Sequence, residues 1–277
     1  MLINIKRGMK VEMKKYWKWL VLVLVVIIAI VGVIFYRRDS NGKPFKASLN
    51  HSKVMMTPNW YAKVRLSAND GATYEVKNNK DKVIQRKTKT KDGKADIKLN
   101  NTGNYTVIAR SDNGHVSKKL PVKVTNYQAN INKWTNSVGP LKFKVNNVKY
   151  KMITKGKENT TDFSDDIFND LHKKYYQITV TYEVKNSGKK AVNPQYTSWL
   201  PVDDSGNEFP WVNGSGEAVQ NDNITGTSAI QPHSSRIGKL TMISNHKFSI
   251  QHLRFNIEEI RGNNGVSIAK GGMAKLK

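Results

Sequence analysis

The chain has 277 residues, including 46 Lys or Arg and 21 Asp or Glu, which gives a formal net charge of +25 at pH 7. It has no cysteine, which excludes disulfides, thiolate metal sites, a cysteine nucleophile and a lipid-modified N-terminal cysteine. This length holds one large domain or two ordinary ones, and the basic excess, spread along the chain, favours polyanionic partners. The Lys- and Asn-rich composition suggests a Gram-positive bacterium.

The first predicted element is a transmembrane helix at residues 19–36. These 18 residues are nearly all Val, Leu and Ile, and at about 1.5 Å per residue a helix of this length spans roughly 27 Å. Basic residues are more frequent in the tail 1–18 than just after the run, so the positive-inside rule places residues 1–18 in the cytoplasm and the bulk of the chain outside the cell. We therefore predict a single-pass protein of the cell membrane.

A cleaved signal peptide is the alternative interpretation of the same run. It would have a shorter apolar region ending in small residues, whereas this run ends with bulky Phe35 and Tyr36 and then Arg37. These residues favour an uncleaved signal anchor. Met1, Met9 and Met13 are all candidate start residues, and each leaves the topology unchanged.

A polar linker is expected at 37–44, followed by an all-β domain at 45–126. Four turn signals divide this region at a spacing typical of a sandwich: Asn69-Asp70-Gly71, Lys91-Asp92-Gly93, Asn101-Thr102-Gly103 and Asp112-Asn113-Gly114. Residues Asn101–Ala109 resemble the immunoglobulin stretch D-x-G-x-Y-x-C-x-A, with Val107 in place of the cysteine. The resemblance implies a bacterial immunoglobulin-like domain in which Tyr105 forms a tyrosine corner. The alternative is an edge strand that begins at a glycine and carries an ordinary Tyr.

A second β-rich domain is expected at 127–277. Apolar residues alternate along Leu141–Ile153 but change phase at Asn146-Asn147, which indicates a hairpin turn or a bulge. Tyr176–Val184 alternates strictly, as a half-buried strand does. Leu253, Phe255 and Ile257 repeat the same pattern late in the chain.

The order of these pieces resembles the telokin-like immunoglobulin-fold domain of unknown function found in Gram-positive lipoproteins and membrane-anchored exoproteins. Four segments carry the resemblance: Leu141–Ile153 as a first hairpin, Tyr176–Gly188, Leu200–Phe209, and Ile230–Arg236 leading into a strand at Ile237–Ile243. The family implies a fold and an exported location, and it has no established activity. The expected fold class is all-β, with one N-terminal transmembrane helix followed by two immunoglobulin-like β-sandwich domains.

A run of basic residues is the best candidate for function, because strands and turns would present it as a cationic edge that binds polyanions. The alternative is a solvated edge strand whose charges block aggregation. The run consists of Lys77, Lys80, Lys82, Arg86, Lys87, Lys89, Lys91 and Lys94.

Acidic residues suggest two further sites, each with a simpler interpretation. Phe163, Ile167 and Leu171 lie on one helix face, so 161–174 is expected to form a short amphipathic helix that ends near Lys173-Lys174. Its acids leave open a calcium site, although they lack the spacing of a calcium loop; they are Asp162, Asp165, Asp166 and Asp170.

A second group of acids could hydrolyse glycosidic bonds, as paired carboxylates do in glycosidases. However, Asp, Gly and Asn are also the expected residues of a hairpin turn. Those carboxylates are Asp203, Asp204 and Glu208.

Aromatic residues and histidines add no clear catalytic signature. Trp60-Tyr61, Trp199 and Trp211 would stack on sugars if exposed, but core or rim positions are the commoner outcome. The six histidines lack metal-ligand spacing, and neither H-E-x-x-H nor G-x-S-x-G occurs. We expect no enzyme activity, cofactor or metal.

Three functions remain in competition. The preferred one is a non-enzymatic surface module that contacts anionic cell-wall polymers, lipid head groups or an envelope protein, with nucleic acid a weaker candidate. The second is an accessory or sensor subunit of a membrane machine, and the third is an envelope hydrolase.

Overall fold

The computed structural model describes residues 19, 21–31, 42–156, 163, 165–210, 216–222, 224 and 228–277. Residues 19 and 21–31 are helical. None of the helices in these ranges has the length and apolar character needed to cross a membrane. The predicted tail 1–18, parts of the predicted span 19–36 and most of the linker 37–44 lie outside the described residues.

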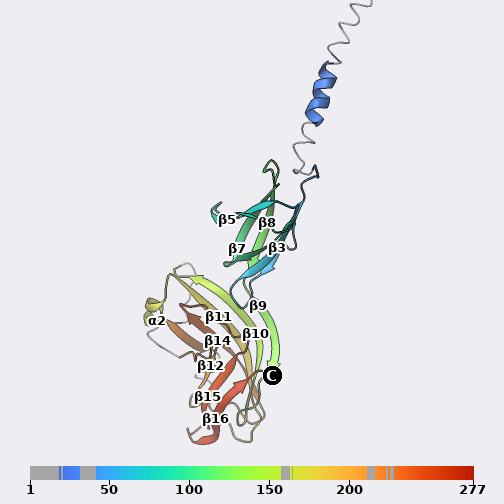
Figure 1. Cartoon of the computed structure of the whole chain (residues 1–277). Helices are drawn as coiled ribbons and strands as arrows, with labels where there is room; N and C mark the ends of the chain where they lie inside the picture. Colours follow the sequence, from blue (N-terminus) through green and yellow to red (C-terminus); the bar gives the residue numbers. More distant parts are fainter. Residues whose placement is uncertain are drawn as a thin grey trace, which may run out of the picture. The chain divides into compact units, whose positions relative to one another are not determined.

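The chain divides into two compact units that interleave along the sequence. The first unit comprises Met1–Lys53, Val64–Ile97 and Gly103–Lys123. The second comprises Val54–Lys63, Lys98–Thr102 and Val124–Lys277. The second unit therefore includes two segments from within the predicted first domain. Both units are built mainly of β-strands (Figure 1), as the sequence predicts.

The strands of residues 47–125 form two sheets. One sheet has the order β1-β3-β6: β1 (Ala47–Leu49), β3 (Ala62–Ala68) and β6 (Lys94–Leu99). The other has the order β2-β8-β7-β4-β5: β2 (Lys53–Met55), β8 (Ser117–Thr125), β7 (Gly103–Arg110), β4 (Thr73–Asn78) and β5 (Val83–Lys89). Alternate residues of β3, β4 and β7 are buried, among them Val64, Val76 and Val107. This period of two places the apolar side of each strand in the core.

The four predicted turns all lie between strands, as the sequence indicates. The Lys91–Lys94 turn shows why glycine is needed there. Gly93 has φ +69°, and a Cβ on it would lie 2.3 Å from the carbonyl oxygen of Ala68. The Gly93 carbonyl also accepts a hydrogen bond of 2.7 Å from Ala68 N. Only a residue without a side chain allows this approach.

The second unit contains two further sheets. The long sheet has the order β13-β14-β11-β10-β9: β13 (Glu217–Asp222), β14 (Ser235–Ser244), β11 (Lys174–Asn186), β10 (Leu141–Thr154) and β9 (Gln128–Trp134). The short sheet has the order β12-β15-β16: β12 (Trp199–Val202), β15 (Arg254–Arg261) and β16 (Ser267–Lys275). Strands β11 and β15 coincide with alternations predicted from the sequence, and β14 covers the strand that the resemblance implies at Ile237–Ile243.

Of the two alternatives predicted at Asn146-Asn147, the bulge is confirmed and the hairpin is wrong. Leu141–Ile153 is not two strands but part of the single strand β10, and the change of phase is a β-bulge between Val145 and Asn147. Strand β9 bulges at the same level, where Asn132 has φ 51°. Asn147 stabilises this irregularity by donating hydrogen bonds to the Ala129 carbonyl and to Asn130 Oδ1, at 3.1 and 2.8 Å.

Aromatic residues fill the core of the second unit. Phe143 of β10 stacks on Phe255 of β15 with ring centroids 4.7 Å apart, so the long and short sheets share this core. Trp199 Nε1 donates to Tyr182 Oη at 2.9 Å, and Tyr182 Oη donates to Asn221 at 2.8 Å. These hydrogen bonds satisfy the polar atoms that burial would otherwise leave unpaired. Burial also raises the pKa of Tyr182.

The predicted amphipathic helix is present but short. Helix α2 (Asp165–Asp170) packs the buried Ile167 and the following Leu171 against Ile153, Tyr175, Ala218 and Ile243. The expected basic end is absent from the helix itself, because Lys173 follows it and Lys174 begins β11.

Candidate functional site

Three residues of the predicted basic run, Arg86, Lys87 and Lys89, lie on β5, the outermost strand of the five-stranded sheet. The other five lie at the end of β4, at the start of β6 or in the turns on either side of β5: Lys77, Lys80, Lys82, Lys91 and Lys94. Strand β5 pairs with β4 on one side only and is exposed along nearly its whole length. Seven of the eight basic side chains are exposed, Lys77 being half-buried. None of the eight forms an ion pair with another described residue. We call these eight residues the basic edge.

Two ordered turns fix the ends of the basic edge. Asn78 Oδ1 accepts hydrogen bonds from the backbone N–H groups of Lys80 and Lys82, at 3.0 and 3.1 Å. At the other end, Lys91 and Lys94 exchange two backbone hydrogen bonds of 2.9 and 2.8 Å. The backbone is therefore ordered while the ammonium groups stay in solvent. Such a surface attracts polyanions through its field and through close phosphate contacts.

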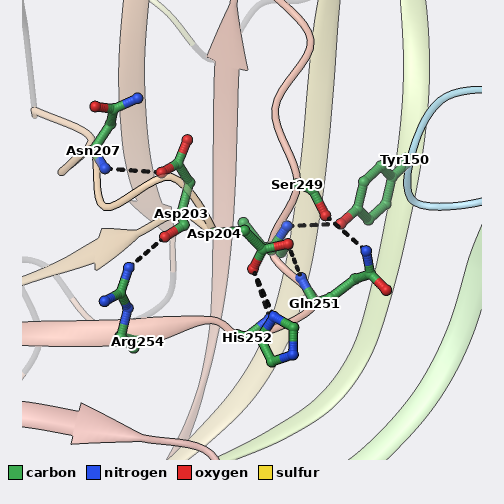
Figure 2. Close-up of polar contacts among 9 residues, drawn as sticks. Tyr150, Asp203, Asp204, Asn207, Ser249, Gln251, His252 and Arg254 are labelled. Carbon is green, nitrogen blue, oxygen red and sulfur yellow. Dashed lines mark hydrogen bonds and ion pairs between the residues drawn. The ribbon is translucent and has the colours of Figure 1, made fainter.

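Two of the three carboxylates at the second candidate site accept hydrogen bonds from the backbone, and the third, Glu208, accepts one from Asn256 Nδ2 at 3.0 Å. Asp203 is buried, and its Oδ1 accepts from Asn207 N at 2.8 Å, which closes the turn at Gly206. Asp204 accepts from Gln251 N at 3.1 Å and from His252 N at 2.7 Å. Figure 2 shows the two carboxylates directed to these separate partners. This geometry agrees with the turn interpretation.

Three side chains brace the loop that precedes β15. Trp60 Nε1 donates to the Phe248 carbonyl at 2.6 Å, and Tyr150 Oη accepts from Ile250 N at 2.9 Å. Asp204 holds the next two residues and donates from its own N to the Ser249 carbonyl at 2.8 Å. We call Phe248–His252 the braced loop. Figure 2 shows Tyr150 and Asp204 in contact with this loop. Burial raises the pKa of Tyr150 to about 12.

The braced loop forms one wall of a groove of about 590 Å³ within the second unit. The other walls come from β9 and from the end of β16. Four Lys or Arg side chains and one His line this groove, with no acid among its lining residues, which are Asn130, Ile131, Lys133, Gln251, His252, Arg254, Lys275, Leu276 and Lys277. We call it the basic groove. The Asp204 carboxylate lies 3.5 Å from Nδ1 of His252, one of the lining residues.

Arg254 links the basic groove to the turn behind it. One Nη donates to the Asp203 carbonyl at 2.7 Å. Its Nε is buried and has no hydrogen-bond partner among the residues that the structure describes. A buried donor of this kind is a place where an acceptor oxygen, from water or a ligand, is expected.

The other predicted sites are not assembled. Trp60 and Trp199 are only 4% and 2% exposed, so neither can stack on a sugar at the surface. Tyr61 is half-buried under Lys98, whose Nζ lies 4.2 Å from the ring centroid. Trp211 lies outside the described residues.

The calcium prediction finds no support in the described ranges. Asp162 and the side chains of Asp165 and Asp166 fall outside them, and Asp170 is exposed. No group of three or more potential metal ligands occurs among the side chains that are described. The described acidic residues of this segment therefore provide no support for a calcium site.

Sequence reasoning missed the basic groove because its residues are dispersed. Lys133, Arg254 and Lys275 belong to three strands, and no local motif joins them. The change of phase at Asn146-Asn147 was the one available signal, since bulges often re-aim side chains at functional sites.

Comparisons with known proteins do not identify the chain. No protein-family model matches it, and no curated protein does. Similar solved structures include a functionally unknown protein from Listeria monocytogenes EGD-e, at 12% identity and a TM-score of 0.36, covering 54% of this chain and 84% of that one. A conserved hypothetical protein from Bacillus anthracis has 14% identity and a TM-score of 0.30, covering 55% and 97%. A marsupial T cell receptor has 8% identity and a TM-score of 0.20, covering 83% and 99%. Likeness at these scores carries no argument about fold family or function.

Proposed function

We propose that this protein is a non-enzymatic binding module of the bacterial cell surface, and that its basic edge binds anionic envelope polymers by charge. The single observation behind this proposal is the exposure of seven unpaired Lys and Arg side chains on and around one edge strand. Because phosphate contacts release counterions, binding of this kind weakens steeply as salt rises. At physiological ionic strength screening acts over about 8 Å, so only close and multiple contacts persist.

The proposal includes anchoring in a membrane through residues 19–36, with the bulk of the chain outside. Residues 21–31 are all apolar. Ten of them have large hydrophobic side chains that are exposed, so the helix is apolar on every side. A helix that is apolar on every side requires a nonaqueous environment. The asymmetry of Lys and Arg on the two sides of the run supports a cytoplasmic N-terminus. Protease added to wall-stripped cells should then remove residues 40–277 and spare the tail; protein released with a new N-terminus near residue 33 would contradict anchoring.

The fold part of the proposal is that both units are immunoglobulin-like, the second of the telokin-like kind. Two sheets in each unit and an apolar core support it, as does the burial of Tyr105 at the predicted corner position of β7.

Binding to purified wall teichoic acid across a range of salt concentrations tests the basic edge. The test variant replaces Lys80, Lys82, Lys87 and Lys89 by Gln. A matched control replaces Lys53, Lys118, Lys119 and Lys123, which are exposed at the opposite edge of the same sheet. Both variants lose four charges, so they differ only in where the charge is lost.

We expect the basic-edge variant to bind about tenfold more weakly or worse and to show a shallower salt dependence, because fewer counterions are released. The opposite-edge control should stay close to the unmodified protein. Equal loss in the two variants, or binding that is indifferent to salt, would refute the assignment.

A further inference from the structure

We propose that the basic groove of the second unit is a discrete binding site for a phosphate-bearing ligand. This inference goes beyond the proposed function and does not depend on the basic edge. Lys133, Arg254, Lys275 and Lys277 converge there from β9, β15 and the end of β16, together with His252. None of the four Lys and Arg side chains is ion-paired with a described residue. Their charge is therefore available to a ligand.

The backbone around this groove is held in place, as a defined site requires. Asn132 adopts φ 51° within the β9 bulge, directly before Lys133, and Asn147 fixes the bulge through two hydrogen bonds. The opposite wall is the braced loop, whose Gln251 and His252 N–H groups are occupied by Asp204. At the third wall, Lys277 N donates to the Trp134 carbonyl at 3.1 Å. The backbone therefore has little conformational entropy left to lose on binding, which favours affinity.

The chemistry of the lining selects phosphate. Four cations without an acid among the lining residues repel metal ions and favour an anion that carries more than one charge. The amides of Asn130 and Gln251 add neutral donors suited to hydroxyl or ester oxygens. Arg254, which lines the groove, offers a planar set of donors suited to phosphate. A volume of about 590 Å³ suits a phosphate with a sugar or polyol attached.

Calorimetric titration of the full-length protein, reconstituted in nanodiscs of neutral lipid without detergent, tests this site. The first probe is a short oligomer of glycerol phosphate, and the second is nanodiscs containing phosphatidylglycerol, both used near physiological salt. The test variant is Lys133→Gln with Lys275→Gln. The control is Lys185→Gln with Lys189→Gln, which removes two exposed charges of the same unit outside the groove.

We expect one binding site per chain and a dissociation constant that rises at least about tenfold in the groove variant, since each charge-assisted contact is worth roughly that factor. The control should change less than about twofold. The basic-edge variant should keep groove binding, so failure of one proposal is distinguishable from failure of the other. All the substituted lysines are exposed, so thermal unfolding should be the same for each variant.

The probe that binds identifies the source of the phosphate. Groove-dependent binding of the oligomer indicates a soluble polymer, and groove-dependent binding of the nanodiscs indicates a lipid head group; either result supports the site. Binding of neither probe, equal loss in the groove and control variants, or several equivalent sites per chain would overturn the proposal.

Discussion

The basic edge and the basic groove carry the same kind of charge on backbones that are supported differently. On the basic edge, the lysines extend from an outer strand that pairs on one side only. In the basic groove, the backbone of Phe248–His252 is held by three side chains distant in sequence, Trp60, Tyr150 and Asp204. An edge can therefore gain or lose charge at little structural cost. The groove depends on buried residues, so binding and stability are coupled there.

Removing Trp60 should have the largest effect on stability. Its ring is buried against Tyr150 and Tyr176, with centroids 5.2 and 4.7 Å away, and its Nε1 binds the braced loop. Trp60→Ala should lower the free energy of unfolding by about 3 to 5 kcal/mol, as large core truncations do. Chemical denaturation measures this, with Tyr61→Ala at the half-buried neighbour as the control. A smaller loss for Trp60 than for Tyr61 would contradict the bracing role.

Removing the Asp204 carboxylate should have the second largest effect on stability. Asp204→Ala leaves the N–H groups of Gln251 and His252 without their acceptor, at a cost of about 2 kcal/mol in unfolding free energy. Asp204→Asn keeps one acceptor oxygen and should cost about half as much. Urea denaturation measures both, and phosphate binding in the groove should weaken in parallel. Full stability in Asp204→Ala would mean that the loop is held without it.

Tyr150 should make stability depend on alkaline pH. The unfolded side chain has a pKa near 10, and burial raises the pKa in the folded state to about 12. Below pH 10 both states keep the proton. Between pH 10 and 12 the unfolded state loses it first, so the stability contributed by Tyr150 falls as pH rises.

Tyr150→Phe abolishes this titration and also the hydrogen bond with Ile250 N. The variant should be about 1 kcal/mol less stable than the unmodified protein at pH 8, and this gap should shrink by about 1 kcal/mol at pH 11. Urea denaturation at the two values of pH measures the gap. A difference in stability that stays constant or widens between pH 8 and pH 11 would show that the pKa of Tyr150 is not raised in the folded state.

The basic-edge substitutions should have the smallest effect on stability. Lys80, Lys82, Lys87 and Lys89 are exposed, and surface changes of this kind usually alter the free energy of unfolding by less than about 0.5 kcal/mol. Thermal unfolding of the Gln variant should therefore match that of the opposite-edge control. A loss comparable to that of Asp204→Ala would make the edge a structural element.

The sequence predicts what depends on neighbouring residues. Alternation located β11 and β15, because strand burial repeats every two residues. Short polar segments ending in glycine located the four turns, because positive φ favours glycine. The positive charge of β5 could also be predicted from the sequence, because its basic residues are close together in the chain. A phase change could not distinguish a bulge from a hairpin at Asn146-Asn147, because both reverse the alternation and only pairing with β11 separates them.

The basic groove and the bracing of its loop depend on contacts between distant residues. Trp60 and Phe248 are separated by 188 positions, and Tyr150 and Ile250 by 100. No local pattern indicates such pairs. Trp60 was rightly expected as a core or rim residue, but its hydrogen bond to the loop required the structure.

The most direct test of the contrast between the two surfaces is a salt series of backbone amide chemical shifts during titration with a glycerol phosphate polymer. At low salt, amides of both β5 and the groove should shift. As salt rises above the physiological range, the β5 shifts should fade first, while those of Gln251, His252 and Lys275 persist, because the groove makes close contacts that screening weakens less. The account would be contradicted if the shift changes persisted at β5 and were lost at the groove, or if they faded equally at both surfaces.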